Sequence, residues 1–366
     1  MDGSACRPRP RRVAATHGEF MTASRRILAA VTATAAALAL AACGSSAGDE
    51  PAEGSEFPAI SFMYSPYADY APFFVAFEKG YFDDAGVEVE LIAKGGSSGE
   101  TFQHVSTGNV TGGGASWAAG LYNATAAGAS LAVVSSVSRV PESGPNPAPL
   151  MVREGSGITE GADLAGKKIG TTGESGFSYY SISLALASVG LSLEDVETVN
   201  LGAGDIIPAL ANGSIDASWT IEPISTAVAD EGFGHELLDI DYHAGTELGA
   251  IIFNAEFTDE HPDAVVAFLT AYLRATQELA GGGWEDPATQ EIIAEYTNLP
   301  VETLTSLALS DVDPEGKVNW ESVRAQEEFF REQDSLEFEG DSGIEDVYRD
   351  DLRQQAVDAL EALQES

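Results

Sequence analysis

Aromatic and hydroxyl side chains recur where predicted strands end and helices begin. Aromatic faces can stack on a planar ligand. Hydroxyl groups and the free N–H groups at the start of a helix can hold an anion or a carbonyl group. Together these residue types suit the non-covalent capture of a small molecule. The candidates for this role are Tyr64, Tyr67, Tyr70, Ser97, Ser98, Trp117, Ser175, Phe177 and Trp219.

The serines among these candidates also have a structural interpretation. Ser97, Ser98, Ser175 and the neighbouring Ser178 stand where helices are predicted to begin. A serine at the start of a helix caps backbone N–H groups with its own side chain. Capping and ligand binding use the same geometry, so both interpretations stay open.

The two candidate tryptophans end similar stretches of sequence, "TGGGASW" at Trp117 and "SIDASW" at Trp219. Each stretch reads as a strand that ends in Ser-Trp. Either tryptophan could simply fill a core. Their equivalent positions favour two facing rings, one from each of two similar lobes, which stack on a planar ligand when a cleft closes.

The motifs of the common enzyme classes are incomplete in this sequence. The stretch "TGESGFS" lacks the glycine spacing of a nucleophile elbow, and "GGSSGE" lacks the lysine of a phosphate loop. The five histidines show no metal-ligand spacing. We therefore expect no enzyme, no catalytic residue, no metal and no cofactor.

Alternating strands and helices must position the candidate residues. Such alternation predicts an α/β fold with mostly parallel sheets covered on both faces, in which ligands bind beyond the carboxyl ends of the strands. Strands are predicted at 59–64, 87–91, 131–135, 150–152, 168–171, 196–201, 216–221 and 249–254. Helices are predicted at 73–79, 99–107, 121–127, 178–189 and 205–211, and a helical C-terminal tail has segments starting near Pro262, Pro287, Pro300, Trp320 and Ile344.

The N-terminal region has the three parts of a secretory leader. Arg25 and Arg26 precede an apolar stretch, and Leu-Ala-Ala-Cys ends it at Cys43. The stretch is shorter than the roughly 20 residues of a membrane-spanning helix. It resembles a bacterial lipobox, so we expect a leader at 1–42 with the true start at Met21, a lipid on Cys43 and a disordered tether at 43–57. An ordinary signal peptide with a chance cysteine is the alternative, and export by the general or by the twin-arginine route stays open in either case.

Charge and cysteine content narrow the partners further. The formal net charge of the chain is −40, which repels nucleic acid and anionic lipid surfaces. One of the two cysteines, Cys6, lies in the predicted leader, and the other would be acylated. We therefore expect no disulfide, no nucleic-acid partner and no membrane contact except through the lipid anchor.

Three stretches resemble the type 2 periplasmic solute-binding proteins of bacterial ABC importers, in the branch that binds sulfonates, taurine, nitrate and thiamine pyrimidines. They are "APFFVAFEKGYFDDAGVEVEL", "DLAGKKIG" and "NGSIDASWTIEP". The resemblance implies two α/β lobes, 58–150 and 151–245, with 246–366 returning to the first lobe and adding helices. It implies chain crossings near 148–153 and 242–249, and a ligand-binding role for Glu222. The chain departs from the family at 109–114, where three glycines follow Asn109-Val110-Thr111.

The function implied by the resemblance is that of a monomeric, extracytoplasmic lipoprotein on the outer face of the cell membrane. It would capture a small molecule between two closing lobes and deliver it to an ABC permease and its ATPase. A sensory lipoprotein and an enzyme similar to a pyrimidine synthase are the alternatives from other classes.

The charge of the ligand is judged from six loops at the predicted strand ends, 64–71, 95–100, 115–117, 173–177, 202–205 and 219–223. None of them holds an arginine or a lysine, although Lys94 adjoins one, whereas Asp69, Glu100, Glu174 and Glu222 lie in them. This favours a neutral or cationic nitrogen heterocycle, such as a thiamine-pyrimidine precursor. An oxyanion such as an alkanesulfonate, taurine or nitrate stays open.

Overall fold

Two five-stranded sheets organise the chain. The computed structural model describes residues 56–94, 98–237 and 243–365, which belong to one compact unit beginning at residue 46. The predicted leader, Cys43 and Ser97 lie outside the described residues, as does most of the predicted tether. For Ser98 only the backbone is described.

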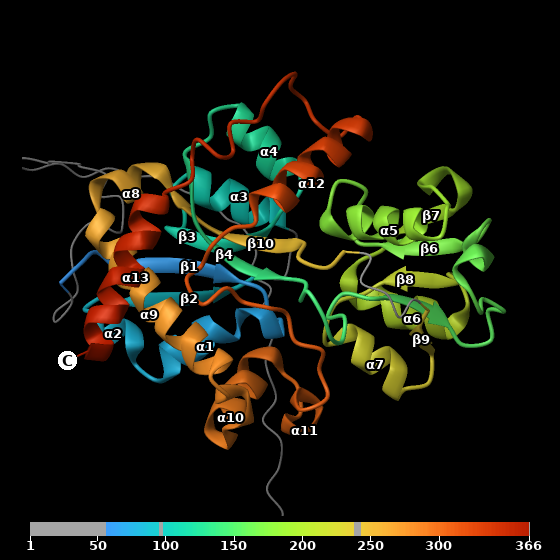
Figure 1. The fold of residues 1–366 in the computed structure, drawn as a ribbon, viewed down its shortest axis with the longest axis horizontal. Helices are drawn as coiled ribbons and strands as arrows, with labels where there is room; N and C mark the ends of the chain where they lie inside the picture. Colours follow the sequence, from blue (N-terminus) through green and yellow to red (C-terminus); the bar gives the residue numbers. More distant parts are fainter. Residues whose placement is uncertain (1–55, 95–97, 238–242, 366) are drawn as a thin grey trace, which may run out of the picture. The chain divides into compact units, whose positions relative to one another are not determined.

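The first sheet has the strand order β2-β1-β3-β10-β4 (Figure 1). The pairs β1–β2 and β1–β3 are parallel, and β10 is antiparallel to both of its neighbours. The strands are β1 (Ile60–Tyr64), β2 (Val89–Ala93), β3 (Gly112–Ser116), β4 (Leu131–Arg139) and β10 (Glu247–Asn254).

The second sheet repeats this arrangement with the order β7-β6-β8-β5-β9. Its parallel pairs are β6–β7 and β6–β8, and β5 is antiparallel to both of its neighbours. The strands are β5 (Leu150–Arg153), β6 (Lys168–Thr171), β7 (Glu197–Asn200), β8 (Ala217–Trp219) and β9 (Gly234–Glu236). Strand for strand, β1, β2 and β3 of the first sheet correspond to β6, β7 and β8.

The predicted α/β fold with mostly parallel sheets is confirmed: in each sheet four strands run in the same direction and one, β10 or β5, runs against them. The antiparallel pairs arise because β5 and β10 follow the segments in which the chain passes from one sheet to the other, so each enters its new sheet against the direction of the parallel strands. The division of the chain into the lobes 58–150, 151–245 and 246–366 stays a prediction, and the two sheets draw their strands from 60–139 with 247–254 and from 150–236.

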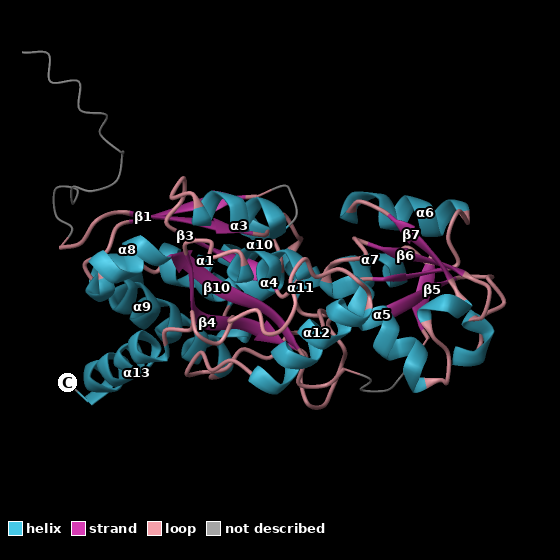
Figure 2. Ribbon diagram, turned by 90° about the horizontal axis from the view of Figure 1, so that it is seen from above, coloured by secondary structure: helices cyan, strands magenta, loops and turns pink. Residues whose placement is uncertain are grey.

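Helices cover both faces of the first sheet (Figures 1 and 2). One face carries α1, α9 and α13 and the other α3, α4 and α12, as the two buried side-chain clusters of this sheet show. The helices are α1 (Ala71–Glu78), α2 (Tyr81–Asp84), α3 (Ser98–Ser106), α4 (Ala119–Ala126), α5 (Phe177–Ser188), α6 (Ile206–Asn212), α7 (Ile224–Asp230), α8 (Ala255–Glu260), α9 (Pro262–Ala280), α10 (Pro287–Thr297), α11 (Val301–Leu304), α12 (Trp320–Glu332) and α13 (Asp350–Glu365).

Short 3-10 turns complete the list of elements: η1 (Ala68–Tyr70), η2 (Gly161–Leu164), η3 (Leu193–Asp195), η4 (Ala203–Asp205) and η5 (Gly283–Glu285). The predicted tail is helical, but its last helix begins at Asp350 rather than near Ile344. Within the described part of the chain, no helix combines the length and apolar character that a membrane crossing requires.

Two of the three phenylalanines of α1, Phe73 and Phe74, are buried, and the third, Phe77, is partly exposed. Phe73 stacks on Phe62 of β1 with ring centroids 4.6 Å apart and lies 4.5 Å from Tyr272 of α9. Phe74 stacks on Tyr296 of α10 at 4.5 Å. Phe77 instead keeps 39 % of its surface exposed. It follows Phe73 and Phe74 by four and three residues, on the same side of the helix but in the last turn of α1.

Candidate ligand-binding cavity

A cavity of about 520 Å³ lies where the parallel strands of both sheets end. Its wall contains residues from the loops that follow β1, β2 and β3 and from the loops that follow β6, β7 and β8. Strand ends of this kind present loops and helix starts to a ligand. The position of the cavity therefore agrees with the site expected from the strand pattern.

Five of the ten candidate residues line this cavity. Tyr67 and Tyr70 come from the loop after β1, Ser175 from the loop after β6, Phe177 from the start of α5, and Trp219 from the end of β8. The ring of Phe177 meets that of Trp219 edge-on, with centroids 6.0 Å apart. The structure thus brings aromatic side chains from both sheets to one cavity, while their contact with a ligand stays a prediction.

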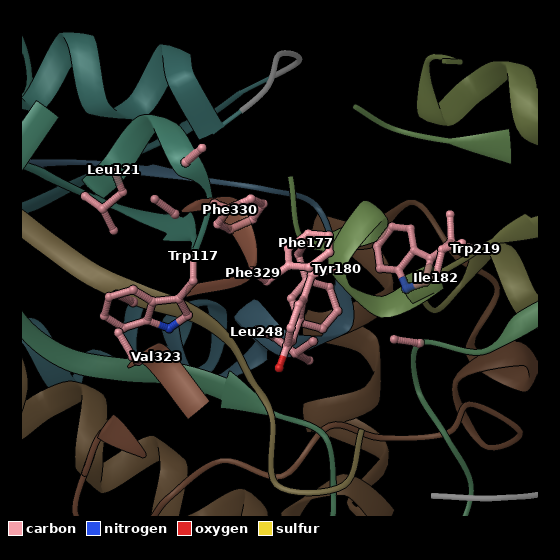
Figure 3. Close-up of a cluster of buried hydrophobic side chains, with 14 of the residues drawn as sticks. Trp117, Leu121, Phe177, Tyr180, Ile182, Trp219, Leu248, Val323, Phe329 and Phe330 are labelled. Carbon is pink, nitrogen blue, oxygen red and sulfur yellow. The ribbon is translucent and has the colours of Figure 1, made fainter. Parts of the chain in front are cut away.

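Trp117 does not line the cavity. Its side chain is fully buried, and its ring lies 6.5 Å from Tyr122 and 6.1 Å edge-on from Trp320 of α12. Figure 3 shows it beside Leu121 and Val323. The expectation that Trp117 and Trp219 form facing plates is therefore wrong: α12, from the C-terminal part of the chain, returns to cover Trp117.

Two further candidates, Tyr64 and Glu222, also lie off the cavity wall. Tyr64 is buried against Phe74, with ring centroids 5.0 Å apart. The Glu222 carboxylate accepts hydrogen bonds from the Thr226 N–H at 3.1 Å and the Thr226 hydroxyl at 3.0 Å. It also accepts one from the Ala308 N–H at 3.2 Å. These contacts give Glu222 a structural role at the start of α7.

The three glycines that interrupt the family pattern allow close approach to β3. A Cβ atom on Gly114 would stand 2.3 Å from Cε1 of Tyr70, and one on Gly113 would stand 2.6 Å from Cγ2 of Thr101. Contacts this short do not occur between real Cβ atoms and their neighbours. The glycines therefore let the cavity residue Tyr70 and the helix α3 lie directly against the strand.

Lys94 is a cavity residue that the sequence does not single out as a ligand contact. It follows β2 and is only 7 % exposed. Its Nζ donates hydrogen bonds to Thr101 Oγ1 at 3.0 Å and to the Gly114 carbonyl oxygen at 2.9 Å. Burial lowers the pKa of the ammonium to about 8. A basic group thus lines the cavity, which removes the main reason for disfavouring an oxyanion.

An acidic group, Asp69, lies on the wall of the same cavity. The Ser138 hydroxyl donates a hydrogen bond to Asp69 Oδ2 at 3.0 Å. Burial raises the pKa of this carboxyl above its usual value, although the hydrogen bond from Ser138 acts in the opposite direction. Among the described residues, no group of three or more His, Cys, Asp or Glu side chains is placed to hold a metal ion.

The loop that leads from β6 into α5 is held by one hydroxyl group. Ser178 Oγ lies 2.8 Å from Thr171 Oγ1 and accepts a hydrogen bond from the Thr172 N–H at 3.1 Å. Loop residues Thr172, Gly173 and Ser175 then border the cavity. The Ser175 carbonyl oxygen accepts a hydrogen bond of 3.0 Å from Ala119 N–H, at the start of α4. This bond links loops that follow strands of the two different sheets.

Aromatic contacts through α12 provide a second link between the sheets. Phe329 of α12 meets Tyr180 of α5 edge-on at 5.2 Å and lies 5.4 Å from Phe330. Phe330 in turn lies 6.2 Å from Tyr122 of α4. Figure 3 shows Phe329 next to Phe177 and Tyr180. Helix α12 thus contacts helices that belong to each sheet.

A family model described as NMT1/THI5 like matches residues 67–282, more than half of the chain. The matched range begins in the loop after β1 and ends just after α9, so it contains every strand except β1 and all of the cavity wall except Ser65.

Curated relatives carry more than one kind of name. A protein of Schizosaccharomyces pombe named 4-amino-5-hydroxymethyl-2-methylpyrimidine phosphate synthase is 29% identical over 230 residues, 59% of this chain. That match spans 62% of the relative, less than two thirds of its length. The taurine-binding periplasmic protein of Escherichia coli is 30% identical over 123 residues, 33% of this chain and 38% of that protein.

Several solved structures with a similar fold are binding proteins. The nitrate-binding protein of Synechocystis superimposes with a TM-score of 0.68 at 16% identity, covering 83% of this chain and 89% of that one. The alkanesulfonate-binding protein of Xanthomonas axonopodis gives a TM-score of 0.64 at 19% identity, covering 79% and 97%. At these identities the likeness concerns the fold alone, and it agrees with the predicted periplasmic-binding-protein fold.

The names of the relatives correct one prediction. The incomplete motifs led us to expect no enzyme, yet several curated relatives at about 29% identity are named as pyrimidine phosphate synthases. The expectation is therefore wrong. Its weakness is physical: the motifs considered describe nucleophile elbows, phosphate loops and metal sites, and an enzyme built on a binding-protein fold needs none of the three.

Proposed function

Because the chain belongs to the NMT1/THI5-like family, we propose that it is an extracytoplasmic receptor that captures a small molecule in the cavity and delivers it to an ABC permease and its ATPase. The observation that carries this proposal is the composition of the cavity wall. Residues after the six strands that form the parallel pairs, three from each sheet, meet around one space of about 520 Å³. Ligand pockets commonly have volumes of roughly 300–1,000 Å³.

The mechanism of capture follows from a wall shared between two sheets. A ligand that contacts both Tyr70, after β1, and Trp219, at the end of β8, stabilises the conformations in which both side chains can reach it. It therefore shifts the population toward a closed form, since a ligand favours the state in which it makes more contacts. A permease can then distinguish the closed, ligand-bound form from the empty form of the receptor.

Names among the relatives support this role without fixing the ligand. A taurine-binding protein and binding proteins for nitrate and alkanesulfonates are similar in sequence or in fold. The relatives named as pyrimidine phosphate synthases suggest a thiamine-pyrimidine precursor. The ligand is therefore sought among aminopyrimidines, sulfonates and nitrate.

The anchor is a separate part of the proposal. The receptor would be held on the outer face of the membrane by a lipid on Cys43 and would act as a monomer. Replacing Cys43 with serine should release the protein from the membrane fraction. If Cys43→Ser protein stays with the membranes after a high-salt wash, the lipid anchor is refuted while the capture of a ligand is not.

Thermal-shift measurements test the capture of a ligand. Purified protein is screened with 4-amino-5-hydroxymethyl-2-methylpyrimidine, taurine, ethanesulfonate, benzenesulfonate and nitrate. We expect at least one compound to raise the melting temperature, and Trp219→Phe to weaken the effect. Trp284→Phe is the matched control, because Trp284 lies outside the cavity wall. A panel without any hit would contradict the proposal.

A pyrimidine phosphate synthase is the second candidate function, and the names of the relatives favour it. The purified protein, incubated with small molecules extracted from cells as the source of substrates, would then form a phosphorylated aminopyrimidine, which mass spectrometry of overnight reactions detects. Formation of that product in amounts above one equivalent per chain would show that the protein is an enzyme rather than a receptor. Saturable binding without product supports the receptor.

A further inference from the structure

Lys94 is a buried cation in the cavity wall that has no anionic partner among the described residues. Its two hydrogen bonds, to Thr101 Oγ1 and to the Gly114 carbonyl, go to neutral oxygens. An ammonium group has three N–H donors, so these bonds leave one for a ligand. Burying a charge is costly unless it is paired. The wall of the cavity therefore offers an incompletely satisfied positive charge.

The charged and titratable groups around Lys94 do not remove this charge. Glu100 on α3 is the carboxylate that acts on it, and its effect is smaller than that of burial. Asp69 and Tyr70, from the loop after β1, share the cavity, and both have pKa values raised by burial. Strand β3 contributes only glycine, alanine and serine on the facing side. At neutral pH the pKa of about 8 keeps most Lys94 side chains protonated.

The second sheet offers donors to the same cavity. Helix α5, with 12 residues, begins at Phe177 on the cavity wall. The first N–H groups of a helix have no partner within the helix, and its N-terminal end carries partial positive charge. Here the first turn has no acidic residue and its capping residue, Gly176, has no side chain. An anion in this cavity can thus meet a lysine from one sheet and a helix start from the other.

We propose that Lys94 is the anion-binding residue of the cavity and that the ligand is a small organic anion, such as a sulfonate or a carboxylate, with an apolar or planar body. The body would lie against the apolar part of the wall, which includes Phe102, Val137, Phe177, Trp219, Ile221 and Leu248. This inference rests on the proposed function and adds to it the charge of the ligand and the residue that recognises it.

Binding of an anion at Lys94 has a measurable consequence in protons. A bound anion favours the charged ammonium and raises its pKa. Near pH 8 about half of the Lys94 side chains are neutral in the free protein, because the pKa is about 8. Anion binding at that pH should therefore take up on the order of half a proton per chain, by linkage. A ligand that avoids Lys94 would leave its protonation unchanged.

The test is isothermal titration calorimetry of benzenesulfonate at pH 8 in two buffers with different ionisation enthalpies. Benzenesulfonamide serves as the neutral ligand of similar shape. We expect proton uptake with benzenesulfonate and much weaker binding of the sulfonamide. Lys94→Met should lose the uptake and bind benzenesulfonate roughly 10-fold to 100-fold more weakly, as expected for one charge-assisted hydrogen bond. Lys317→Met, at an exposed lysine outside the cavity wall, should behave as the wild type.

NMR of the lysine side chains tests the role of Lys94 in the wild-type protein, so the result does not depend on a variant that could misfold. In wild-type protein labelled with ¹³C at lysine Cε, one resonance should titrate near pH 8 and shift to a higher pKa with benzenesulfonate. Binding of benzenesulfonate without proton uptake, and equally by Lys94→Met, overturns the role of Lys94 but leaves the receptor intact. If the aminopyrimidine binds and none of the anions does, the role of Lys94 is likewise overturned while the receptor remains intact. Failure of every compound in the panel overturns the proposed function as well.

Discussion

Tyr70 lies directly over Gly114, so closely that a Cβ atom on the glycine would stand 2.3 Å from the tyrosine ring. The carbonyl oxygen of the same glycine accepts the hydrogen bond from Lys94. One residue of β3 thus sets the position of an aromatic and of a basic group in the cavity wall.

Substitution of this glycine should disturb both fold and site. We expect Gly114→Ala to lower the free energy of unfolding by about 1–3 kcal/mol, as overpacking does, and to displace Tyr70 from the cavity wall. Urea denaturation followed by circular dichroism measures the effect. Gly204→Ala is the control, since a Cβ there meets nothing within 4 Å. Equal stability of the two variants would show that Tyr70 does not rest on Gly114.

Glu222 should matter for stability more than for ligand affinity. Its carboxylate satisfies two N–H groups and a hydroxyl group. Glu222→Ala leaves these donors without their acceptor, which should lower the free energy of unfolding by about 1–3 kcal/mol. Glu174→Ala removes an exposed carboxylate and should change stability little. If Glu222→Ala instead weakens ligand binding tenfold at unchanged stability, the family-based role of Glu222 is correct.

The buried Glu247 should make stability depend on pH. Glu247 begins β10, is fully buried, and accepts hydrogen bonds from Ser136 Oγ at 2.7 Å and from the Asn319 N–H at 2.8 Å. Burial raises its pKa from 4.5 to about 7. The folded state therefore binds more protons than the unfolded state between these values, so its stability falls as pH rises from about 4.5 to about 7.

Replacing Glu247 with glutamine tests this dependence. A shift of this size corresponds to roughly 3 kcal/mol across that pH range. Glu247→Gln should remove most of it, which urea denaturation at a series of pH values measures, whereas Glu302→Gln on the surface should leave it in place. The raised pKa would be contradicted if the free energy of unfolding of the wild type rose over this pH range by the same amount as that of Glu247→Gln.

Local sequence signals predicted much of the fold. Pro262 and Pro287 occupy the first turns of α9 and α10, where the fixed backbone angle of proline suits a helix start. The correspondence of "TGGGASW" and "SIDASW" is real at the level of strands, since β3 and β8 occupy the same place in the two sheet orders. The one antiparallel strand of each sheet, β10 or β5, was not predicted, because strand direction depends on where the chain enters the sheet and no local pattern records that.

The site was predicted less completely because burial depends on distant residues. Trp117 and Trp219 look alike in sequence, and only the return of Trp320, some two hundred residues later, buries the first beneath α12. Lys94 directly follows β2, and its local sequence gives no sign that the side chain is buried. Its surroundings come from later parts of the chain, since Nζ donates hydrogen bonds to Thr101 Oγ1 of α3 and to the Gly114 carbonyl oxygen of β3.

The most direct test of the account is a crystal structure of the protein with the strongest compound from the thermal-shift panel. We predict density for that compound within the cavity, in contact with Tyr70 from one sheet and with Trp219 from the other. Density on an outer surface, or density in the cavity that touches residues of only one sheet, would contradict capture between the two sheets.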